Sequence, residues 1–546
     1  MGQIMEIEIH GNGSELQGVG HAPDGRAVFV KGALPGERVR VRETRVSARF
    51  MEAELQAVLS PSPHRRAPQC PLYAACGGCQ ALHMDYEYSL FLKRQRVTDA
   101  LERLGGFEAP HVLPILGMES PFHYRNKAEY AIESGPNGVR VGFRAPMSHR
   151  VIDAPGCLLQ HPLSLGTARV LRKWLAARPD AAVLCRALVT RVTGKDQVMA
   201  VLCTGPKAPR EMEDLGRLLF GQIPGMKSFY HLTQRDRPRH ALDGRARLMR
   251  GERVLTDGIL GLEFEISPQS FFQVNPTQTQ VLYTQALEAA RLTGRELVHD
   301  AYCGAGTISL LMARQARHVV GVEIVESAIL DARENARRNG LEHKSEFILG
   351  DAAQILPGLK GGQPDVICVD PPRKGVDAGL IEAIRKSGPE RVVYVSCNPA
   401  TLARDLKLLC EGGAFRLESV RPVDMFPWTG HVETVVLLSH KKPDSYIHID
   451  VEFGEGEGKI PVDKIVQRAE QYKPKERVTY KRIKEYILEK YGFKVHTAYI
   501  AEVKRSLGLP MYDAPNAVEK LKQARKHPTP EKVEAIKDAL HYFAVI

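Results

Sequence analysis

The chain has 546 residues, of which 43% are hydrophobic and 25% charged, as in ordinary soluble globular proteins, and its length suits several domains. Its formal net charge of +11 favours a polyanionic partner. Since no apolar run reaches transmembrane length and the N-terminus lacks a signal-peptide core, we expect a cytosolic protein with no membrane partner. Ten cysteines in a cytosolic chain are not expected to form a disulfide framework.

Residues 1–60 alternate polar and apolar positions between glycine-rich turns, which predicts a small β-barrel. Every second residue from Arg38 is an arginine, so these side chains share one face of a strand and the intervening valines share the other. A row of guanidinium groups on a small barrel suits phosphate contact, which favours RNA binding over a merely solubilising face. The basic surface comprises Arg38, Arg40, Arg42, Arg45 and Arg49.

Residues 61–267 begin with a Pro-containing linker and then alternate short strands with helices, as in an α+β domain. Four cysteines gather in its first half: Cys70, Cys76, Cys79 and Cys157. Four thiolates suit zinc or an iron-sulfur cluster, and the spacing alone leaves that choice open. A radical-SAM site is not expected, because the pattern is Cys-x5-Cys-x2-Cys rather than Cys-x3-Cys-x2-Cys. Farther on, Arg125 and Lys127 lie near aromatic residues and suit either RNA contact or a solvated strand edge.

From about residue 268 to 440, helices and strands alternate, which predicts a parallel sheet wound with helices. Gly304 and Gly306 lie between a strand and a helix, where the backbone can approach a ligand. Glu323, seventeen residues after Gly306, ends the next strand and can accept hydrogen bonds from ribose hydroxyls, and Asp351 ends the strand after that. This combination predicts a nucleoside cofactor, and the D-x-x-x-G-x-G form is similar to that of S-adenosylmethionine (SAM)-dependent methyltransferases.

The stretch "DVICVDPPRKGVD" (Asp365–Asp377) ends the following strand at the same sheet edge. Asp370 can reach a cofactor or a substrate there, and Arg373 and Lys374 supply positive charge. A D-P-P-x turn also occurs in methyltransferases that act on exocyclic amines, so this stretch alone leaves two chemistries open.

Cys397 follows an apolar strand and precedes a helix for which we expect Thr401 as the N-cap. Strand-to-helix loops carry the reactive groups of many α/β enzymes, although a lone cysteine there is otherwise read as a small packing residue. Uracil C5 is too weak a nucleophile to take a methyl group unaided, and a thiolate that adds to C6 activates it. The site is expected to lower the thiol pKa, and amine methylation needs no such thiol.

The C5 chemistry also needs a base, and Glu433 precedes an apolar strand that enters the same sheet edge. Its position after an aromatic, glycine-containing loop favours catalysis over a surface charge at the strand entry, and His431 is the competing base. Phe426 and Trp428 of that loop are expected to pack beside the base or to stack on a nucleobase.

Five segments occur in the order seen in RumA/TrmA-type RNA (uracil-C5)-methyltransferases: "SPQSFFQVN", "DAYCGAGT", "DPPRKGVD", "SCNPATLARD" and "MFPWTGHVET". The chain resembles that family over roughly residues 1–440, and its barrel resembles the TRAM domain. The resemblance implies Cys397 as the nucleophile and Glu433 as the base. It implies these cofactor contacts: Gln273, Tyr302, Thr307, Glu323, Asp351 and Asp370. The four-cysteine pattern resembles the 23S rRNA branch, which implies a [4Fe-4S] cluster on Cys70, Cys76, Cys79 and Cys157.

The segment 441–546 lies outside this resemblance and holds 21 Lys and Arg against 16 Asp and Glu. Two helices are expected in it, either as a helix-turn-helix-like nucleic-acid module or as a plain helical bundle.

The sequence therefore predicts an α/β protein with four parts: an OB-like TRAM barrel (1–60), an iron-sulfur α+β domain (61–267), a Rossmann-like SAM-dependent methyltransferase domain (268–440) and a basic helical extension (441–546). The predicted function is methylation of C5 of a uridine in 23S rRNA by a monomeric enzyme. The alternatives are a tRNA uracil-C5 methyltransferase, an RNA amine methyltransferase and a non-catalytic RNA-binding protein.

Overall fold

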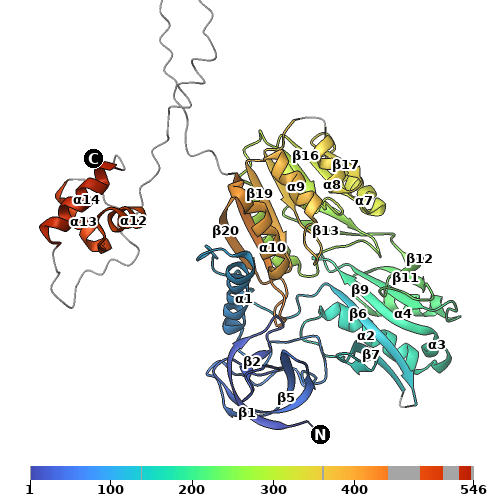
Figure 1. Ribbon diagram of the computed structural model, residues 1–546. Coiled ribbons are helices and arrows are strands. Elements are labelled where there is room, and N and C mark those ends of the chain that lie inside the picture. The colour runs from blue at the N-terminus through green and yellow to red at the C-terminus, as the bar shows by residue number, and fades with distance from the viewer. Residues whose placement is uncertain (1, 137, 360–361, 441–479, 508–527, 543–546) are drawn as a thin grey trace, which may run out of the picture. The chain divides into compact units, whose positions relative to one another are not determined.

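The computed structural model describes residues 2–136, 138–359, 362–440, 480–507 and 528–542. The chain divides into two compact units, 1–442 and 443–546, and the first unit contains three adjoining parts (Figure 1). Of the extension predicted from residue 441 onward, 441–479 and 508–527 lie outside the described residues. No helix in the described ranges is long and apolar enough to cross a membrane.

The first part is a closed five-stranded barrel, which confirms the predicted fold of the N-terminal segment. In its fourth strand, exposed arginines alternate with Val39 and Val41, and both valines are fully buried in the barrel core. The strands follow the order β1-β2-β3-β5-β4, with bounds β1 (Ile4–Asn12), β2 (Gly18–His21), β3 (Ala27–Val30), β4 (Arg38–Val46) and β5 (Phe50–Ser60).

The helix that follows the barrel in the chain, α1 (Tyr86–Ala100), contributes Val97 to a core shared with Leu402 and Leu406. The strands after it form a seven-stranded central sheet of order β12-β11-β10-β9-β6-β7-β8. One face of this sheet packs on helices through a core that includes Leu171, Trp174 and Leu219. The elements are β6 (Lys127–Gly135), β7 (Gly138–Arg144), β8 (Val151–Asp153), α2 (Pro162–Ala176), α3 (Pro179–Leu184), β9 (Cys185–Val192), β10 (Val198–Thr204), α4 (Met212–Gln222), β11 (Met226–Gln234) and β12 (Gly244–Gly251).

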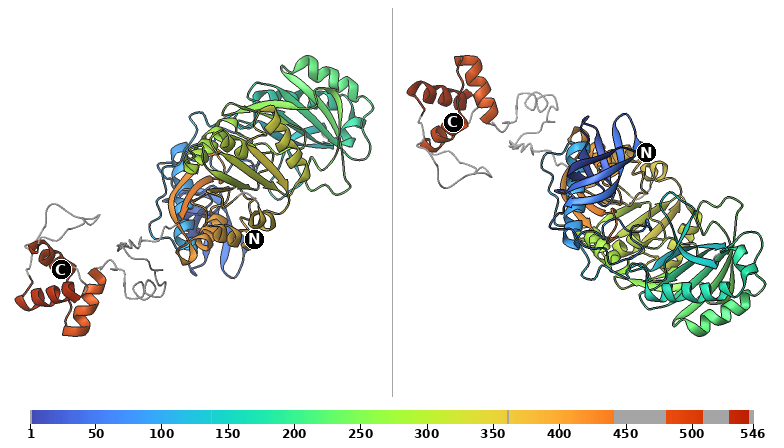
Figure 2. Two further views of the ribbon diagram at one scale, coloured as in Figure 1. Left: turned by 90° about the horizontal axis from the view of Figure 1, so that it is seen from above. Right: turned by 90° about the horizontal axis from the view of Figure 1, so that it is seen from below.

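The third part is a second seven-stranded sheet of order β17-β16-β15-β18-β19-β21-β20, wound with helices (Figure 2). Its first five strands are parallel, which confirms the predicted architecture, and β21 inserts antiparallel between β19 and β20. The elements are α5 (Pro276–Ala290), β15 (Leu297–Ala301), α6 (Thr307–Ala313), β16 (His318–Glu323), α7 (Glu326–Arg338), β17 (Ser345–Leu349), α8 (Ala352–Ile355), β18 (Val366–Val369), α9 (Ala378–Ser387), β19 (Arg391–Ser396), α10 (Pro399–Cys410), β20 (Phe415–Val423) and β21 (Glu433–His440).

The central sheet and the wound sheet share one hydrophobic core. Val201 and Leu232 of the central sheet lie in the same buried cluster as Leu282 of α5 and Val298 of β15. The hairpin β13 (Leu255–Ile259) and β14 (Leu262–Ile266) contributes to this cluster between them. Because apolar burial of this extent is strongly stabilising, the shared core fixes the two sheets relative to each other.

The helix after Cys397 begins one turn earlier than predicted. Asn398 is the N-cap of α10, and its Oδ1 accepts a hydrogen bond from the Ala400 N–H at 3.1 Å. Pro399 occupies the first helical position, which suits its fixed φ. The expectation of Thr401 as the cap is therefore wrong, and the Thr401 hydroxyl instead donates to the Asn398 carbonyl oxygen at 3.2 Å.

The second unit contains α12 (Tyr480–Tyr491), α13 (Thr497–Ser506) and α14 (Pro530–Tyr542). A core that includes Ile483, Ile487, Ile500, Val503 and Ile536 joins the three helices. Two helices were expected in residues 441–546, and the described residues of this segment contain three.

Candidate active site

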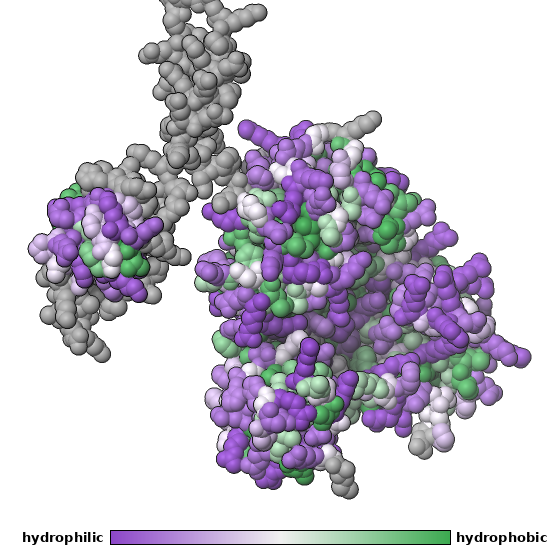
Figure 3. All heavy atoms as spheres, in the orientation of Figure 1, coloured by the Kyte–Doolittle hydropathy of each residue, from purple (hydrophilic) through white to green (hydrophobic). Residues whose placement is uncertain are grey.

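A cavity of about 800 Å³ opens at the carboxyl ends of the parallel strands. The surface is hollowed where the wound sheet meets the central sheet, and hydrophilic residues surround the hollow (Figure 3). In α/β sheets this edge is the usual place for ligands. All the residues predicted as catalytic or cofactor-binding line the cavity: Gln273, Tyr302, Thr307, Glu323, Asp351, Asp370, Cys397 and Glu433.

The glycine loop and Glu323 form one wall. Gly304 and Gly306 have φ of +54° and +80°, which glycine adopts without strain. A Cβ on Gly306 would lie 3.0 Å from the Phe347 ring, so close packing also requires glycine there. The carboxylate of Glu323 accepts hydrogen bonds from the Gly304 N–H at 3.2 Å and the Val325 N–H at 2.9 Å. These two bonds hold the Glu323 side chain at the end of β16, beside the loop.

Asp351 and Tyr302 border the same wall. Asp351 is the N-cap of α8, and its Oδ1 accepts from the Ala353 N–H at 3.0 Å. Tyr302 has φ of +75° and its hydroxyl interacts with Asp377. Its pKa is raised to about 12, by burial first and then by the nearby Asp377 and Asp351 carboxylates. Tyr302 therefore remains a neutral hydrogen-bonding side chain at ordinary pH.

Asp300 and Tyr283 are cavity residues that were not predicted individually. Asp300 is buried at the end of β15, and its Oδ2 accepts a hydrogen bond from the Ser309 hydroxyl at 2.5 Å. Its Oδ1 has no hydrogen-bond partner in the described part of the chain, and burial raises its pKa to about 7. Tyr283 interacts with the Gln273 side chain, and its hydroxyl lies 3.5 Å from the Thr307 hydroxyl. The first aspartate of the D-x-x-x-G-x-G form was the available signal for Asp300.

Cys397 lies just beyond β19 and its side chain is half-buried. Burial, followed by the Glu433 and Asp370 carboxyls, raises its pKa to about 11, while the Arg373 guanidinium acts in the opposite direction. The expected lowering of the thiol pKa is therefore wrong, because desolvation and two neighbouring carboxyls outweigh one cation.

Glu433 is brought next to Cys397 by the strand register. Ser396, just before Cys397, pairs with Thr434, just after Glu433. Glu433 is buried, so it is not a surface charge at the strand entry. Burial and the carboxyl of Asp370 raise the Glu433 pKa to about 8, against the Arg373 guanidinium. Burial likewise raises the pKa of Asp370 to about 7. The two acids thus change charge near neutral pH.

Arg373 is the cation of this cluster, and His431 stands beside it. The guanidinium Nη2 of Arg373 lies 3.3 Å from His431 Nε2. Desolvation and the Arg373 charge lower the pKa of His431. The imidazole is therefore neutral and adjoins a cation, whereas the Glu433 carboxyl lines the same cavity as the Cys397 thiol and interacts with it electrostatically.

Asp405 of α10 holds the loop that carries Asp370 and Arg373. Its Oδ2 accepts hydrogen bonds from the Val376 N–H at 2.8 Å and the Tyr394 hydroxyl at 2.7 Å. Gly375 has φ of +78°, and a Cβ there would lie 2.4 Å from Asp405 Oδ2. The loop is thus fixed to the helix that begins just after Cys397.

A buried ion pair anchors the loop before Glu433. Lys93 of α1 and Asp424 have fully buried side chains, and Lys93 Nζ lies 2.5 Å from Asp424 Oδ1. Lys93 also donates to the Phe426 carbonyl oxygen at 3.0 Å. Phe426 lines the cavity, but Trp428 is buried and stacks on Phe122 with ring centroids 5.3 Å apart. The expectation that Trp428 could stack on a nucleobase is therefore wrong, because its ring packs inside the protein.

The four predicted cysteine ligands surround a second, smaller cavity of about 80 Å³, together with Arg125. Burial and the other three thiols raise the pKa of Cys79 to about 12. Arg125, which borders this cavity, has a buried Nε without a hydrogen-bond partner in the described ranges. In the described part of the chain, no group of His, Cys, Asp or Glu is arranged to hold a metal ion.

Four of the five arginines predicted to form the basic surface of the barrel are paired with glutamates. Arg38 and Arg40 each lie 2.8 Å from Glu6, on the neighbouring strand β1. Arg42 lies 2.5 Å from Glu54, and Arg45 lies 3.6 Å from Glu52. These pairs reduce the net positive charge of the surface predicted to bind RNA.

Sequence comparisons match three family descriptions: TRAM domain over residues 1–55, methyltransferase domain over 298–373, and tRNA (Uracil-5-)-methyltransferase over 358–441. An uncharacterized RNA methyltransferase of Halalkalibacterium halodurans is 42% identical over 449 residues, covering 80% of this chain and 97% of the relative. One of Caldanaerobacter subterraneus subsp. tengcongensis is 41% identical over 448 residues, covering 80% and 98%.

Among solved structures, the chain is similar to a Pyrococcus abyssi tRNA (uracil-54, C5)-methyltransferase in complex with S-adenosyl-L-homocysteine (SAH). The TM-score is 0.63 and the identity 26%, over 80% of this chain and all of that one. Barrel, wound sheet and cavity together define a SAM-dependent RNA methyltransferase with an N-terminal TRAM domain. The chain belongs to the RNA (uracil-C5)-methyltransferase family.

Proposed function

We propose that the protein methylates C5 of a specific uridine in 23S rRNA, with Cys397 as the nucleophile and Glu433 as the acceptor of the C5 proton. One observation carries this proposal: the Cys397 thiol and the Glu433 carboxyl lie beside each other in the cavity that also contains the predicted cofactor residues. Methylation of an exocyclic amine needs no thiol at this position, so the arrangement favours carbon methylation.

The proposed reaction has three steps. The Cys397 sulfur forms a bond to uracil C6, and the electron pair of the C5–C6 double bond moves to C5. SAM, when bound, would supply the methyl group: C5 bonds to the methyl carbon while the methyl–sulfonium bond breaks, its electron pair stays on sulfur, and SAH is the leaving group. Glu433 then takes the C5 proton, the C5–C6 double bond re-forms, and the carbon–sulfur bond breaks to release the Cys397 thiolate.

The charges of the cavity suit a cationic cofactor. Glu323 would hold the ribose hydroxyls, and Gln273, Tyr302, Thr307, Asp351 and Asp370 would complete the contacts. Asp300 Oδ1, which is buried and lacks a partner in the described ranges, would accept a hydrogen bond from the cofactor. A positive charge beside Asp300 and Asp370 favours their ionised forms and also favours the Cys397 thiolate, which offsets the effect of burial.

The cysteine cavity supports a [4Fe-4S] cluster held by Cys70, Cys76, Cys79 and Cys157. Four thiols face one space, and Arg125 adds a cation suited to a thiolate-ligated, negatively charged group. With all irons ligated by thiolates, the cluster would stabilise the central domain.

The choice of 23S rRNA rests on the four-cysteine pattern. A tRNA substrate is the second candidate, because the similar Pyrococcus abyssi structure is described as a tRNA (uracil-54, C5)-methyltransferase. We propose that the barrel at 1–60 contributes to RNA binding.

The test incubates purified protein and SAM with unmodified transcripts of 23S rRNA and of tRNA, and analyses the nucleosides by mass spectrometry. We expect 5-methyluridine in the 23S rRNA only. An N-methylated base would contradict the carbon chemistry, and 5-methyluridine in tRNA alone would contradict the substrate. Loss of one 5-methyluridine from 23S rRNA of a deletion strain would identify the target position.

A further inference from the structure

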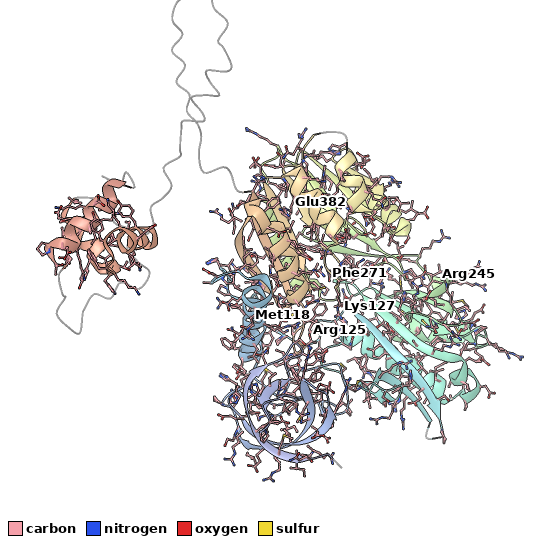
Figure 4. All side chains as sticks on the ribbon, viewed as in Figure 1. Met118, Arg125, Lys127, Arg245, Phe271 and Glu382 are labelled. Atoms are coloured by element: carbon pink, nitrogen blue, oxygen red, sulfur yellow. The ribbon has the colours of Figure 1, made fainter. Side chains whose placement is uncertain are left out.

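The hairpin between β11 and β12 carries a dense group of arginines. Residues 235–250 contain six arginines and two aspartates, and all six arginines are exposed. Strand β12 is the outermost strand of the central sheet, and Arg245 lies at this edge (Figure 4). We call this group the hairpin arginines: Arg235, Arg237, Arg239, Arg245, Arg247 and Arg250.

Four of the hairpin arginines have no carboxylate partner among the ion pairs of the described ranges: Arg237, Arg239, Arg245 and Arg247. Arg235 lies 3.4 Å from Asp243, and the Arg250 guanidinium lies over the Phe220 ring at 5.1 Å. Arg38, Arg40 and Arg42 of the barrel, by contrast, are paired with glutamates. An exposed cluster of unpaired guanidinium groups is a strong attractor for phosphate.

The hairpin is fixed to the rim of the active-site cavity. Gln269 lines that cavity, and its Nε2 donates to the carbonyl oxygens of Leu242 at 2.9 Å and Gly244 at 3.1 Å. Those two residues lie at the start of β12. Two positions after Gln269, Phe271 also lines the cavity, with an exposed side chain. An RNA strand that reaches Cys397 would therefore leave the cavity beside the hairpin.

We propose that Arg237, Arg239, Arg245 and Arg247 bind phosphates of the RNA strand that flanks the target uridine. This inference rests on the proposed RNA methylation. Phosphate contacts fix the position of a strand without reading its sequence, so the hairpin would secure the strand while the cavity selects the base. Each phosphate that is neutralised releases counterions and adds about 0.7 to 0.9 to the slope of log affinity against log salt concentration.

The test replaces these four arginines together with glutamine in the full-length protein (R237Q/R239Q/R245Q/R247Q). Binding of 5-fluorouridine-containing 23S rRNA transcript is measured at several salt concentrations. The matched control also removes four positive charges, at the sheet edge opposite the cavity (R295Q/R317Q/K344Q/K386Q), where β15, β16 and β17 begin and α9 ends. Unchanged SAH binding shows that each variant is folded.

We expect the hairpin variant to reduce the salt slope by about 3 and to weaken binding at least tenfold at low salt, and the control to reduce the slope by less than about 1. Replacement of the same four arginines by lysine, which keeps the positive charge, should retain most of the slope of log affinity against log salt concentration. Equal losses in the hairpin variant and the control, or no loss in either, would overturn the inference. If the wild-type protein binds this RNA but never forms a covalent adduct with it, the proposed function fails while the binding result still decides the role of the hairpin.

Discussion

Asn126 holds the backbone of Gln273 in place: its Nδ2 donates to the Gln273 carbonyl oxygen at 3.0 Å. The Asn126 N–H also donates to the Val274 carbonyl oxygen at 2.9 Å. Arg125, one residue earlier, lines the cysteine cavity. Two consecutive residues, Arg125 and Asn126, therefore connect the cysteine cavity to Gln273, which lines the active-site cavity.

Replacing Asn126 with alanine is expected to weaken SAH binding about tenfold, because the loss of one buried hydrogen bond to the Gln273 backbone costs about 1 kcal/mol or more. Isothermal titration calorimetry with SAH measures this. Asn339, which bonds the Glu263 carbonyl oxygen at 2.7 Å on an exposed surface, provides the control N339A with unchanged affinity. Equal affinity of N126A and wild-type protein would show that Asn126 does not position Gln273.

Replacing Cys79 with serine should lower the iron and acid-labile sulfide content of the purified protein and also weaken SAH binding through the Arg125–Asn126 connection. A buried thiolate ligand cannot be replaced by a serine hydroxyl without loss of the metal group. Cys410, a half-buried cysteine that lines neither cavity, provides the control C410S. Full iron content in C79S, or no iron in the wild-type protein prepared without oxygen, would contradict the cluster assignment.

Removing the Arg373 charge should shift the pH dependence of the proton-abstraction step upward. Glu433 must be ionised to accept the C5 proton, and its pKa is raised to about 8. The rate of adduct release therefore rises with pH as Glu433 ionises. Because Arg373 lowers this pKa, R373Q should move the rising limb to higher pH, by less than about one unit since Arg373 is exposed to solvent screening.

Rapid-quench measurements of adduct release between pH 6 and 10 would show this shift. The neighbouring Lys374 also lines the cavity but is not among the groups that set the Glu433 pKa, so K374Q serves as the control. A profile that moves to lower pH in R373Q would contradict the assignment of Glu433 as the base.

Asp424→Asn should destabilise the protein by about 3 kcal/mol, because the fully buried Lys93 ammonium would lose its counter-charge. Urea denaturation measures the loss. Asp99, which lies on α1 like Lys93, forms an exposed ion pair with Arg103 at 3.6 Å. D99N should therefore lower the free energy of unfolding by less than about 1 kcal/mol. A loss in D424N no larger than that in D99N would show that the buried pair does not anchor the loop before Glu433.

The fold was largely predictable because the alternation of arginine and valine in β4 and the strand–loop–helix pattern around Gly304 are local signals. The cavity residues could be predicted because parallel strands present their carboxyl ends at one edge. Contacts between residues distant in sequence could not be predicted. Glu6, on a neighbouring strand, pairs with Arg38 and Arg40. The Trp428 ring stacks on Phe122 inside the protein. The thiol pKa was predicted wrongly because burial is a property of the assembled site.

The central claim is a covalent bond between the Cys397 sulfur and uracil C6. In 5-fluorouridine RNA this bond should persist, because C5 carries fluorine in place of the proton that must be removed before the cysteine is released. With SAM and this RNA, wild-type protein is expected to shift in mobility on a denaturing gel as an RNA–protein adduct. C397A should lose the adduct, while C303A, which removes a buried thiol of the same cavity, should keep it. An adduct that persists in C397A, or wild-type protein that methylates uridine without ever forming one, would contradict the account.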